Sequence, residues 1–364
     1  MLRCQDGCMQ SAPETRNMRG MRLTKHLPEP AKKALKSSFM FPMYRRMSIR
    51  RQMMADFPYC IIIGVTTKCN LQCTYCPRSV MDSRSLGKDM DFELFKETVD
   101  QASKTAENRT VITPVGLGEP LMYDRYHDAL VYLRGKCPDV PISIDTNGTL
   151  LDTENSRMLC KYLTNAHDVL LVSLNAGNRT SYVALNKADK FDLVVRNIRG
   201  FLEARRELGR GPALVLQILG SNPADEIEDF RDYWGALIGP RDLVSVKPLT
   251  DWGGRVESEI AKKHADALRK TPRYPCLSPF IMAFVHVDGG VYPCCQALAE
   301  GEESDLLLGN IEKKSLRDLC TGARIREIKA EHLKGNWNAF RDCRRCATYA
   351  SYPNLWFKLW NRWL

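Results

Sequence analysis

Three cysteines in the stretch TTKCNLQCTYCPRS have the chemistry and the spacing of metal ligands. Cys69, Cys73 and Cys76 are separated by three and then two residues, so a loop can turn their sulfurs toward one point. Soft thiolates grouped in this way select zinc or iron–sulfur clusters. A structural zinc site takes four ligands, often as CxxC pairs, and neither Cys60 nor Cys137 supplies a convincing fourth. A [4Fe–4S] cluster on three cysteines leaves one iron open for another molecule. The alternatives are reduced core thiols or a zinc loop.

The residue before the third cysteine adds a second signal. Tyr75 directly precedes Cys76, and the resulting CxxxCxφC pattern resembles the signature of radical S-adenosylmethionine (SAM) enzymes. The resemblance implies that Cys69, Cys73 and Cys76 hold a [4Fe–4S] cluster whose open iron binds SAM. It also implies that Tyr75 lies near the adenine. In this family SAM is cleaved to methionine and a 5′-deoxyadenosyl radical, which abstracts a hydrogen atom from the substrate.

From residue 61 onward the chain alternates between short apolar runs and amphipathic periodicity. Six runs predict strands, namely IIIGVTT, VITPVGLG, PISIDTN, DVLLVSLNA, ALVLQILG and LVSVKP. Segments with helical periodicity separate them, which indicates parallel βα units. Sites in such folds lie at the carboxyl ends of the strands, and the cysteine loop begins where the first strand ends. We therefore expect an α/β fold, a partial (β/α)6 TIM-like barrel of residues 57–255.

Polar residues at the later strand ends extend the resemblance. Each could belong to an ordinary strand-to-helix turn, but their order after a CxxxCxxC motif favours the family assignment. The resemblance implies that the glycine of GLGEPL lets the backbone approach SAM and that the following acid meets its amino group. It implies contacts with the ribose or the methionine carboxylate for the strand-end side chains. The cofactor-binding candidates are Tyr75, Gly118, Glu119, Asn147, Ser173, Asn175 and Gln217.

A second group of cysteines lies near the carboxyl end. Four thiolates that include a CxxC pair suit zinc, so zinc is a competing interpretation. The segments DGGVYPC and LGNIEKKSLRDL, followed by a CxxC pair, instead resemble the SPASM/twitch extension of radical SAM enzymes. The chain has no cysteine after Cys346, so the shorter twitch form with one auxiliary [4Fe–4S] cluster is expected in residues 256–364. The expected ligands are Cys276, Cys294, Cys343 and Cys346.

Three further residues are candidates for catalysis. Cys295 follows the expected ligand Cys294 and is either a buried small hydrophobe or, in an epimerisation, a hydrogen-atom donor. Lys247 and Arg255, in VSVKPLTDWGGRV, could position a substrate hydroxyl or favour its deprotonation. Structural ion pairing is the alternative for both cations.

Composition limits the class of protein. The chain has 364 residues, 44% of them hydrophobic, and its mean hydropathy is −0.33, which predicts a soluble globular protein. Fourteen cysteines without an N-terminal h-region predict a reducing, cytoplasmic location. No apolar run is long enough to span a bilayer.

Positive charge is concentrated at the start of the chain. Residues 1–56 carry twelve Lys or Arg and four Asp or Glu, a net of +8 out of +10, and are expected to form a basic, partly disordered arm. The end, YPNLWFKLWNRWL, predicts an aromatic helix. These termini are interpreted as a solvated arm and a packed helix. Peripheral contact with anionic lipid is the alternative.

The reaction expected from the resemblance is oxidation or epimerisation of a carbohydrate-like small molecule. A reducing donor of flavodoxin or ferredoxin type is implied as a partner. No βααα-type recognition pattern precedes residue 57, which ranks a peptide substrate second. An iron–sulfur or zinc-stabilised binding protein is the alternative of another class. Nucleic acid is not an expected partner, because no RNA-binding motif or aromatic platform accompanies the basic arm.

Overall fold

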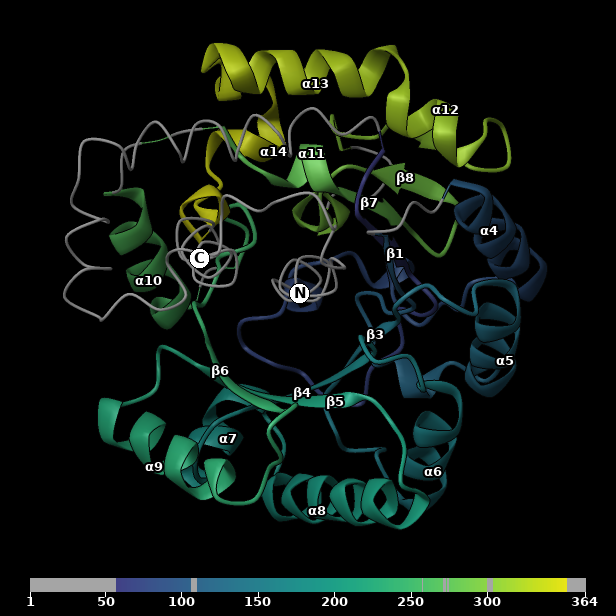
Figure 1. Ribbon diagram of the computed structural model, residues 1–364. Coiled ribbons are helices and arrows are strands. Elements are labelled where there is room, and N and C mark those ends of the chain that lie inside the picture. The colour runs from purple at the N-terminus through teal and green to yellow at the C-terminus, as the bar shows by residue number, and fades with distance from the viewer. Residues whose placement is uncertain are drawn as a thin grey trace, which may run out of the picture.

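The computed structural model describes residues 57–105, 110–256, 258–270, 273, 275–299 and 304–351. Helices surround a curved wall of strands, as Figure 1 shows. The predicted basic arm, residues 1–56, and the predicted aromatic end, residues 352–364, lie outside the described residues. Within the described part, no helix has the length and apolarity needed to cross a bilayer.

Six strands alternate with helices, as the sequence predicted. The strands are β1 (Cys60–Ile63), β2 (Val111–Thr113), β3 (Ser143–Thr146), β4 (Val169–Asn175), β5 (Ala213–Leu219) and β6 (Leu243–Lys247). The helices between them are α4 (Phe92–Thr105), α5 (Tyr126–Lys136), α6 (Thr153–Tyr162), α7 (Arg179–Asn186), α8 (Phe191–Leu208) and α9 (Ala224–Gly235). The short helix α7 was not predicted; the Asn178 side chain caps it by accepting from Ser181 N.

The strands are buried because helices cover them. Ile61, Ile62 and Ile63 are at most 1% exposed, as expected for a parallel strand with covered faces. β1 pairs in parallel with β2, and β3 to β6 form a second parallel sheet in sequence order. A single parallel bridge, Ile112 to Ile142, connects the two sheets. The predicted partial barrel is therefore confirmed.

The carboxyl-terminal extension joins the same wall. It contains α10 (Glu259–Arg269), α11 (Ser278–Ile281), β7 (Met282–Val285), β8 (Gly290–Tyr292), β9 (Gly309–Asn310), α12 (Leu316–Thr321), α13 (Ala323–Lys334) and α14 (Arg341–Arg344). β7 pairs in parallel with β1 over all four of its residues, and β8 and β9 follow antiparallel. The extension is thus hydrogen-bonded to the strand that leads into the cysteine loop.

Buried ion pairs fasten the amino-terminal ends of the strands. Arg134 of α5 contacts Asp168, just before β4, at 2.7 Å. Arg205 of α8 contacts Asp242, just before β6, at 2.6 Å. Both carboxylates are fully buried and also accept backbone N–H groups. This end is thereby rigid, and the carboxyl-terminal strand ends remain for a site.

Candidate functional site

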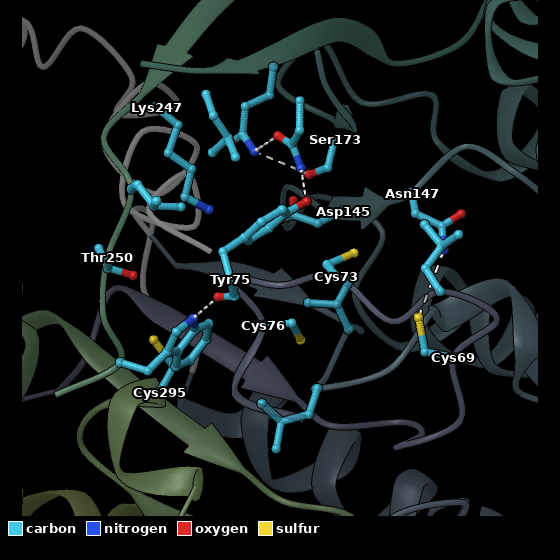
Figure 2. A pocket seen from close by; sticks show the side chains of 18 of the residues that line it. Cys69, Cys73, Tyr75, Cys76, Asp145, Asn147, Ser173, Lys247, Thr250 and Cys295 are labelled. Carbon is cyan, nitrogen blue, oxygen red and sulfur yellow. Dashed lines mark hydrogen bonds between the residues drawn. The ribbon is translucent and has the colours of Figure 1, made fainter. Parts of the chain in front are cut away.

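The predicted cofactor-binding residues and the cysteine loop meet in one cavity at the carboxyl ends of the strands. Figure 2 shows the cysteine loop, the strand-end residues Asn147 and Ser173, and Cys295 of the extension around it. Every predicted cofactor-binding residue lines it: Tyr75, Gly118, Glu119, Asn147, Ser173, Asn175 and Gln217. Cys69, Cys73, Cys76, Lys247 and Cys295 line it as well.

Burial makes the three loop thiols hard to ionise in the metal-free protein. Burial raises the pKa of Cys73 to about 12, and the neighbouring Cys76 charge adds to the effect. Burial also raises the pKa of Cys76, to about 11, and that of Cys69. Metal binding at these thiols must therefore release protons, as thiolate ligation requires.

Asn186 in α7 links the cysteine loop to the barrel. The Cys73 thiol donates to Asn186 Oδ1 at 3.1 Å, and the Tyr75 hydroxyl donates to the same oxygen at 3.0 Å. Asn186 is 1% exposed, and its Nδ2 has no hydrogen-bond partner among the described residues. Turning the amide over would direct this N–H at the Cys73 sulfur. The orphaned donor thus fits a cysteine that is a thiolate ligand better than one that is a thiol.

Asn175 and Gln217 hold the aromatic ring of the loop. The ladder between β4 and β5 shifts register before Asn175, whose φ is 65°, a left-handed conformation that Asn tolerates better than most residues. Asn175 Nδ2 donates to the Tyr75 hydroxyl at 2.6 Å, and Gln217 Nε2 donates to Asn175 Oδ1 at 2.9 Å. Tyr75 is therefore fixed by three polar side chains of the barrel.

Glu119 is a buried carboxyl at the edge of the cavity. It is 2% exposed and accepts from Thr146 Oγ1 at 2.6 Å and from Asn147 N at 2.7 Å. Burial nevertheless raises its pKa to about 7, so it is poised to respond to a cation.

Gly118, next to Glu119, is required by the cysteine loop. A Cβ there would collide with the carbonyl oxygens of Thr66 and Lys68. Gly118 N and Glu119 N donate to these two carbonyls, at 3.1 and 2.8 Å. The glycine therefore lets the strand ends of β1 and β2 approach each other.

The end of β6 and the extension supply the wall opposite the cysteine loop. Lys247 ends β6, and Cys295 follows β8; both face the cavity in Figure 2. In the part of the chain that the structure describes, the Lys247 ammonium has no hydrogen-bond or ion-pair partner. The cavity thus has an ammonium and a thiol on one side and the three loop cysteines on the other.

Arg255 does not line this cavity. Its guanidinium pairs with Asp342, which is 3% exposed, and donates to the carbonyls of Trp252 and Gln296 at 3.1 and 3.3 Å. The charge is thus engaged in joining the end of the barrel to the extension. This placement matches the structural ion pairing that the sequence left as the alternative.

The four cysteines of the extension gather near one another. The pKa of Cys294 is raised by a hydrogen bond with Cys295 and by burial, and the charges of Cys276 and Cys346 contribute. Burial raises the pKa of Cys343, again with contributions from Cys346 and Cys276. These mutual influences indicate that the thiols of the four predicted ligands lie close enough to affect one another's ionisation.

His332 of α13 supports this group of cysteines. It is 1% exposed, and burial lowers its pKa to about 4, so the ring is neutral at pH 7. Cys276 N donates to its Nδ1 at 3.4 Å, which leaves the proton on Nε2. Nε2 lies 3.5 Å from the Cys343 sulfur, to which it can donate.

The donor sets of both cysteine groups fit iron–sulfur clusters. Thiolates are the ligands that hold [4Fe–4S] clusters, and they also hold zinc in structural sites. Within the described residues, no three His, Cys, Asp or Glu side chains are arranged to hold a single metal ion.

Several residues that line the cavity were not predicted from the sequence. Asp145 lines the cavity beside the predicted Asn147, and its place in IDTNG was an available signal. Trp252, with φ 52°, donates from Nε1 to the carbonyl of Tyr75 at 3.0 Å, and no motif marked it. Asn186 carried no signal either, since α7 itself was not predicted.

Both the barrel and the carboxyl-terminal extension match known protein families. Residues 63–230 match the radical SAM superfamily, and residues 276–347 match SPASM, an iron–sulfur cluster-binding domain. A tungsten-containing aldehyde ferredoxin oxidoreductase cofactor-modifying protein of Pyrococcus furiosus is 24% identical over 72% of this chain and 81% of its own length. A probable GTP 3′,8-cyclase of Methanosarcina mazei is 28% identical over 48% of this chain and 52% of its own.

Solved structures share the fold. Streptococcus suis SuiB bound to S-adenosylmethionine aligns with a TM-score of 0.59 at 14% identity, over 88% of this chain and 78% of that one. BtrN in complex with AdoMet and 2-DOIA aligns with a TM-score of 0.51 at 19% identity, over 80% of this chain and 94% of that one. Native anSMEcpe with bound AdoMet gives 0.56 at 16% identity, over 84% and 98%.

Proposed function

Because the chain belongs to the radical SAM superfamily and carries an iron–sulfur cluster-binding domain after its barrel, we propose that it oxidises or epimerises a carbohydrate-like small molecule. When bound, SAM and its [4Fe–4S] cluster supply the radical that removes a hydrogen atom, and the auxiliary cluster supplies an acceptor for one electron. A reducing compartment and a flavodoxin- or ferredoxin-type donor belong to the same proposal.

The proposed ligands follow the two cysteine groups. Cys69, Cys73 and Cys76 would hold the SAM-binding cluster, with Tyr75 fixed beside them. Cys276, Cys294, Cys343 and Cys346 would hold the auxiliary cluster. Glu119 would accept from the SAM ammonium, whose charge offsets the cost of burying a carboxylate. The amides and hydroxyl of Asn147, Ser173, Asn175 and Gln217 would orient SAM.

One observation carries the proposal: the extension and the cysteine loop share a cavity. Cys295 lines the cavity with Cys69, Cys73 and Cys76, and its neighbour in sequence, Cys294, belongs to the second cysteine group. A substrate held between the two walls would therefore be adjacent to the three loop cysteines and to Cys295, the residue after a proposed ligand of the auxiliary cluster. Purely structural clusters would not need this arrangement.

Two residues of the far wall suit the two reactions. The Lys247 ammonium can hold a substrate hydroxyl and favour loss of its proton, which oxidation to a carbonyl requires. The Cys295 thiol can return a hydrogen atom to a substrate carbon, which inversion requires. Arg255 is left out of this assignment because Asp342 engages it.

Deuterium labelling separates the two reactions. The anaerobically reconstituted enzyme is incubated in D2O with SAM, a reductant and a panel of sugars and aminocyclitols. Oxidation gives a product that lacks two hydrogens, has no deuterium on the carbon that reacted and still forms with Cys295→Ala. Epimerisation gives a product with one carbon-bound deuterium and is lost with Cys295→Ala. Cys320→Ala, a buried thiol of α12 away from the cavity, is the matched control.

A different result would redirect the proposal. If 5′-deoxyadenosine formed with a peptide substrate and with none of the panel, the small-molecule assignment would be wrong. If no variant or substrate gave 5′-deoxyadenosine while both clusters assembled, the oxidoreductase or epimerase activity would have to be abandoned in favour of a binding role.

A further inference from the structure

A basic cleft lies over the carboxyl-terminal CxxC turn. It is lined by Arg269 and Lys270 at the end of α10, by Arg273, and by Arg344 and Arg345, with Cys346 and Tyr349 beside them. Arg344 and Arg345 are the two residues between Cys343 and Cys346. The positive charge is therefore placed directly at two proposed ligands of the auxiliary cluster.

Two of the arginines hold the turn itself. The Arg273 guanidinium donates to the carbonyls of Cys343 and Arg344 and stacks on Trp337 and Tyr349, with 5.3 and 5.1 Å to the ring centroids. Arg269 donates to the Arg345 carbonyl at 2.9 Å. These bonds use the backbone carbonyls of Arg344 and Arg345 and do not involve their side chains. Both residues are exposed to solvent.

The charge of the cleft is poorly compensated within the described residues. Arg269 pairs with Asp251 and Asp266. None of the other four cations has an ion-pair partner in the described part of the chain, and no acidic side chain lines the cleft. Such a single-sign surface attracts an oppositely charged partner and orients it on approach.

We propose that this cleft is the docking surface for an acidic one-electron carrier protein of the flavodoxin or ferredoxin class. The inference rests on the proposed auxiliary cluster, since Cys343 and Cys346 would place a redox centre directly beneath the docked protein. Each productive encounter transfers one electron: flavodoxin hydroquinone becomes semiquinone, and the holoenzyme gains one electron. The positive charge of the cleft would steer the carrier to the position from which an electron can reach the auxiliary cluster.

The test is charge reversal with a matched control. The variant Arg344→Glu with Arg345→Glu changes the cleft, and Arg196→Glu with Arg231→Glu makes the same change in net charge on exposed positions of α8 and α9. Binding of oxidised flavodoxin to each holoenzyme is measured by calorimetry at low and high salt. The rate of oxidation of flavodoxin hydroquinone is followed by stopped flow. Photoreduced deazariboflavin, a small reductant, serves as the carrier-independent control.

We expect the cleft variant to bind flavodoxin about tenfold more weakly or worse at low salt, with a smaller salt dependence. Its hydroquinone oxidation should slow in parallel, while the control pair stays within about twofold of wild type. Reduction by deazariboflavin should be equal in all three proteins.

Two results would overturn the docking proposal. One is equal weakening in both charge-reversed proteins, which would indicate net charge alone. The other is binding of inorganic phosphate to the cleft with no binding of flavodoxin, which would indicate a small anionic ligand. Iron per wild-type chain is measured separately: about four rather than about eight would remove the auxiliary cluster and with it the proposed function, whatever flavodoxin does.

Discussion

The buried carboxyl of Glu119 should make the stability of the metal-free protein depend on pH. Its pKa is raised by burial to about 7 from the usual value of 4.5, although Thr146 and Asn147 donate to it. Below pH 4.5 the group is protonated in both folded and unfolded chains and has no differential effect. As the pH rises to 7, the unfolded chain releases the proton first, so the free energy of unfolding falls.

The size of this loss follows from the two pKa values. A pKa difference of one is worth about 1.4 kcal/mol, so the change from 4.5 to about 7 removes roughly 3 kcal/mol of stability by pH 8. Glu119→Gln cannot ionise and should escape this loss. The substitution also sacrifices an acceptor, which costs about 1 kcal/mol at every pH. Wild type should therefore be the more stable at pH 5 and the less stable at pH 8.

Urea denaturation of the reduced, metal-free proteins at pH 5, 6, 7 and 8 measures this crossover. Groups other than Glu119 titrate in both proteins, so their contributions cancel in the difference. Glu226→Gln, a second buried glutamate that accepts from Gly177 N and Ser181 Oγ, gives the cost of hydrogen-bond loss. Parallel stability curves for wild type and Glu119→Gln would refute the raised pKa and with it the argument that this carboxyl awaits a cation.

Three further predictions follow from buried contacts. Arg255→Met should destabilise the protein by about 3 kcal/mol in urea, because it strands a buried carboxylate; unchanged stability with lost product would instead indicate a catalytic arginine. Asn186→Leu should lower the reduction potential of the cluster at Cys73, since no amide N–H can then stabilise the reduced form, and an EPR-monitored titration that shows no shift would contradict the proposed amide reversal. His332→Leu should lower the potential of the auxiliary cluster alone, because it removes the donor to Cys343, and a change at both clusters would indicate misfolding instead.

Strand ends could be predicted from the sequence because their signals are local. An apolar run fixes the strand, and the polar residue after it must lie at the barrel mouth, which is why Glu119, Ser173 and Gln217 reach one cavity. The extension could not be placed in this way. Residues 247 and 295 are far apart in the chain, and the sequence does not show which face of β8 meets the cavity. It therefore named Lys247 and Cys295 as candidates but could not predict that both line one cavity.

Contacts between side chains were also beyond the sequence. The sequence left both a substrate contact and an ion pair open for Arg255, and the choice depends on Asp342, which lies 87 residues away. Asn186 belongs to a helix of only eight residues, which is too short for periodicity to reveal. Its role depends on an amide nitrogen that is buried without a partner among the described residues, and no sequence pattern marks such an atom.

The pairing of β7 with β1 explains why the extension reaches the cavity of the cysteine loop. Gly64, directly after β1, donates its N–H to the Val285 carbonyl at 2.7 Å, so the entry to the cysteine loop is hydrogen-bonded to the extension. A Cβ on Gly64 would sit 3.0 Å from that oxygen, which makes the contact sensitive to any added side chain. β8 follows β7 as its antiparallel neighbour and ends just before Cys294 and Cys295. The position of Cys295 at the cavity is therefore set through the register of three adjacent strands, and the extension cannot be removed without opening the edge of β1.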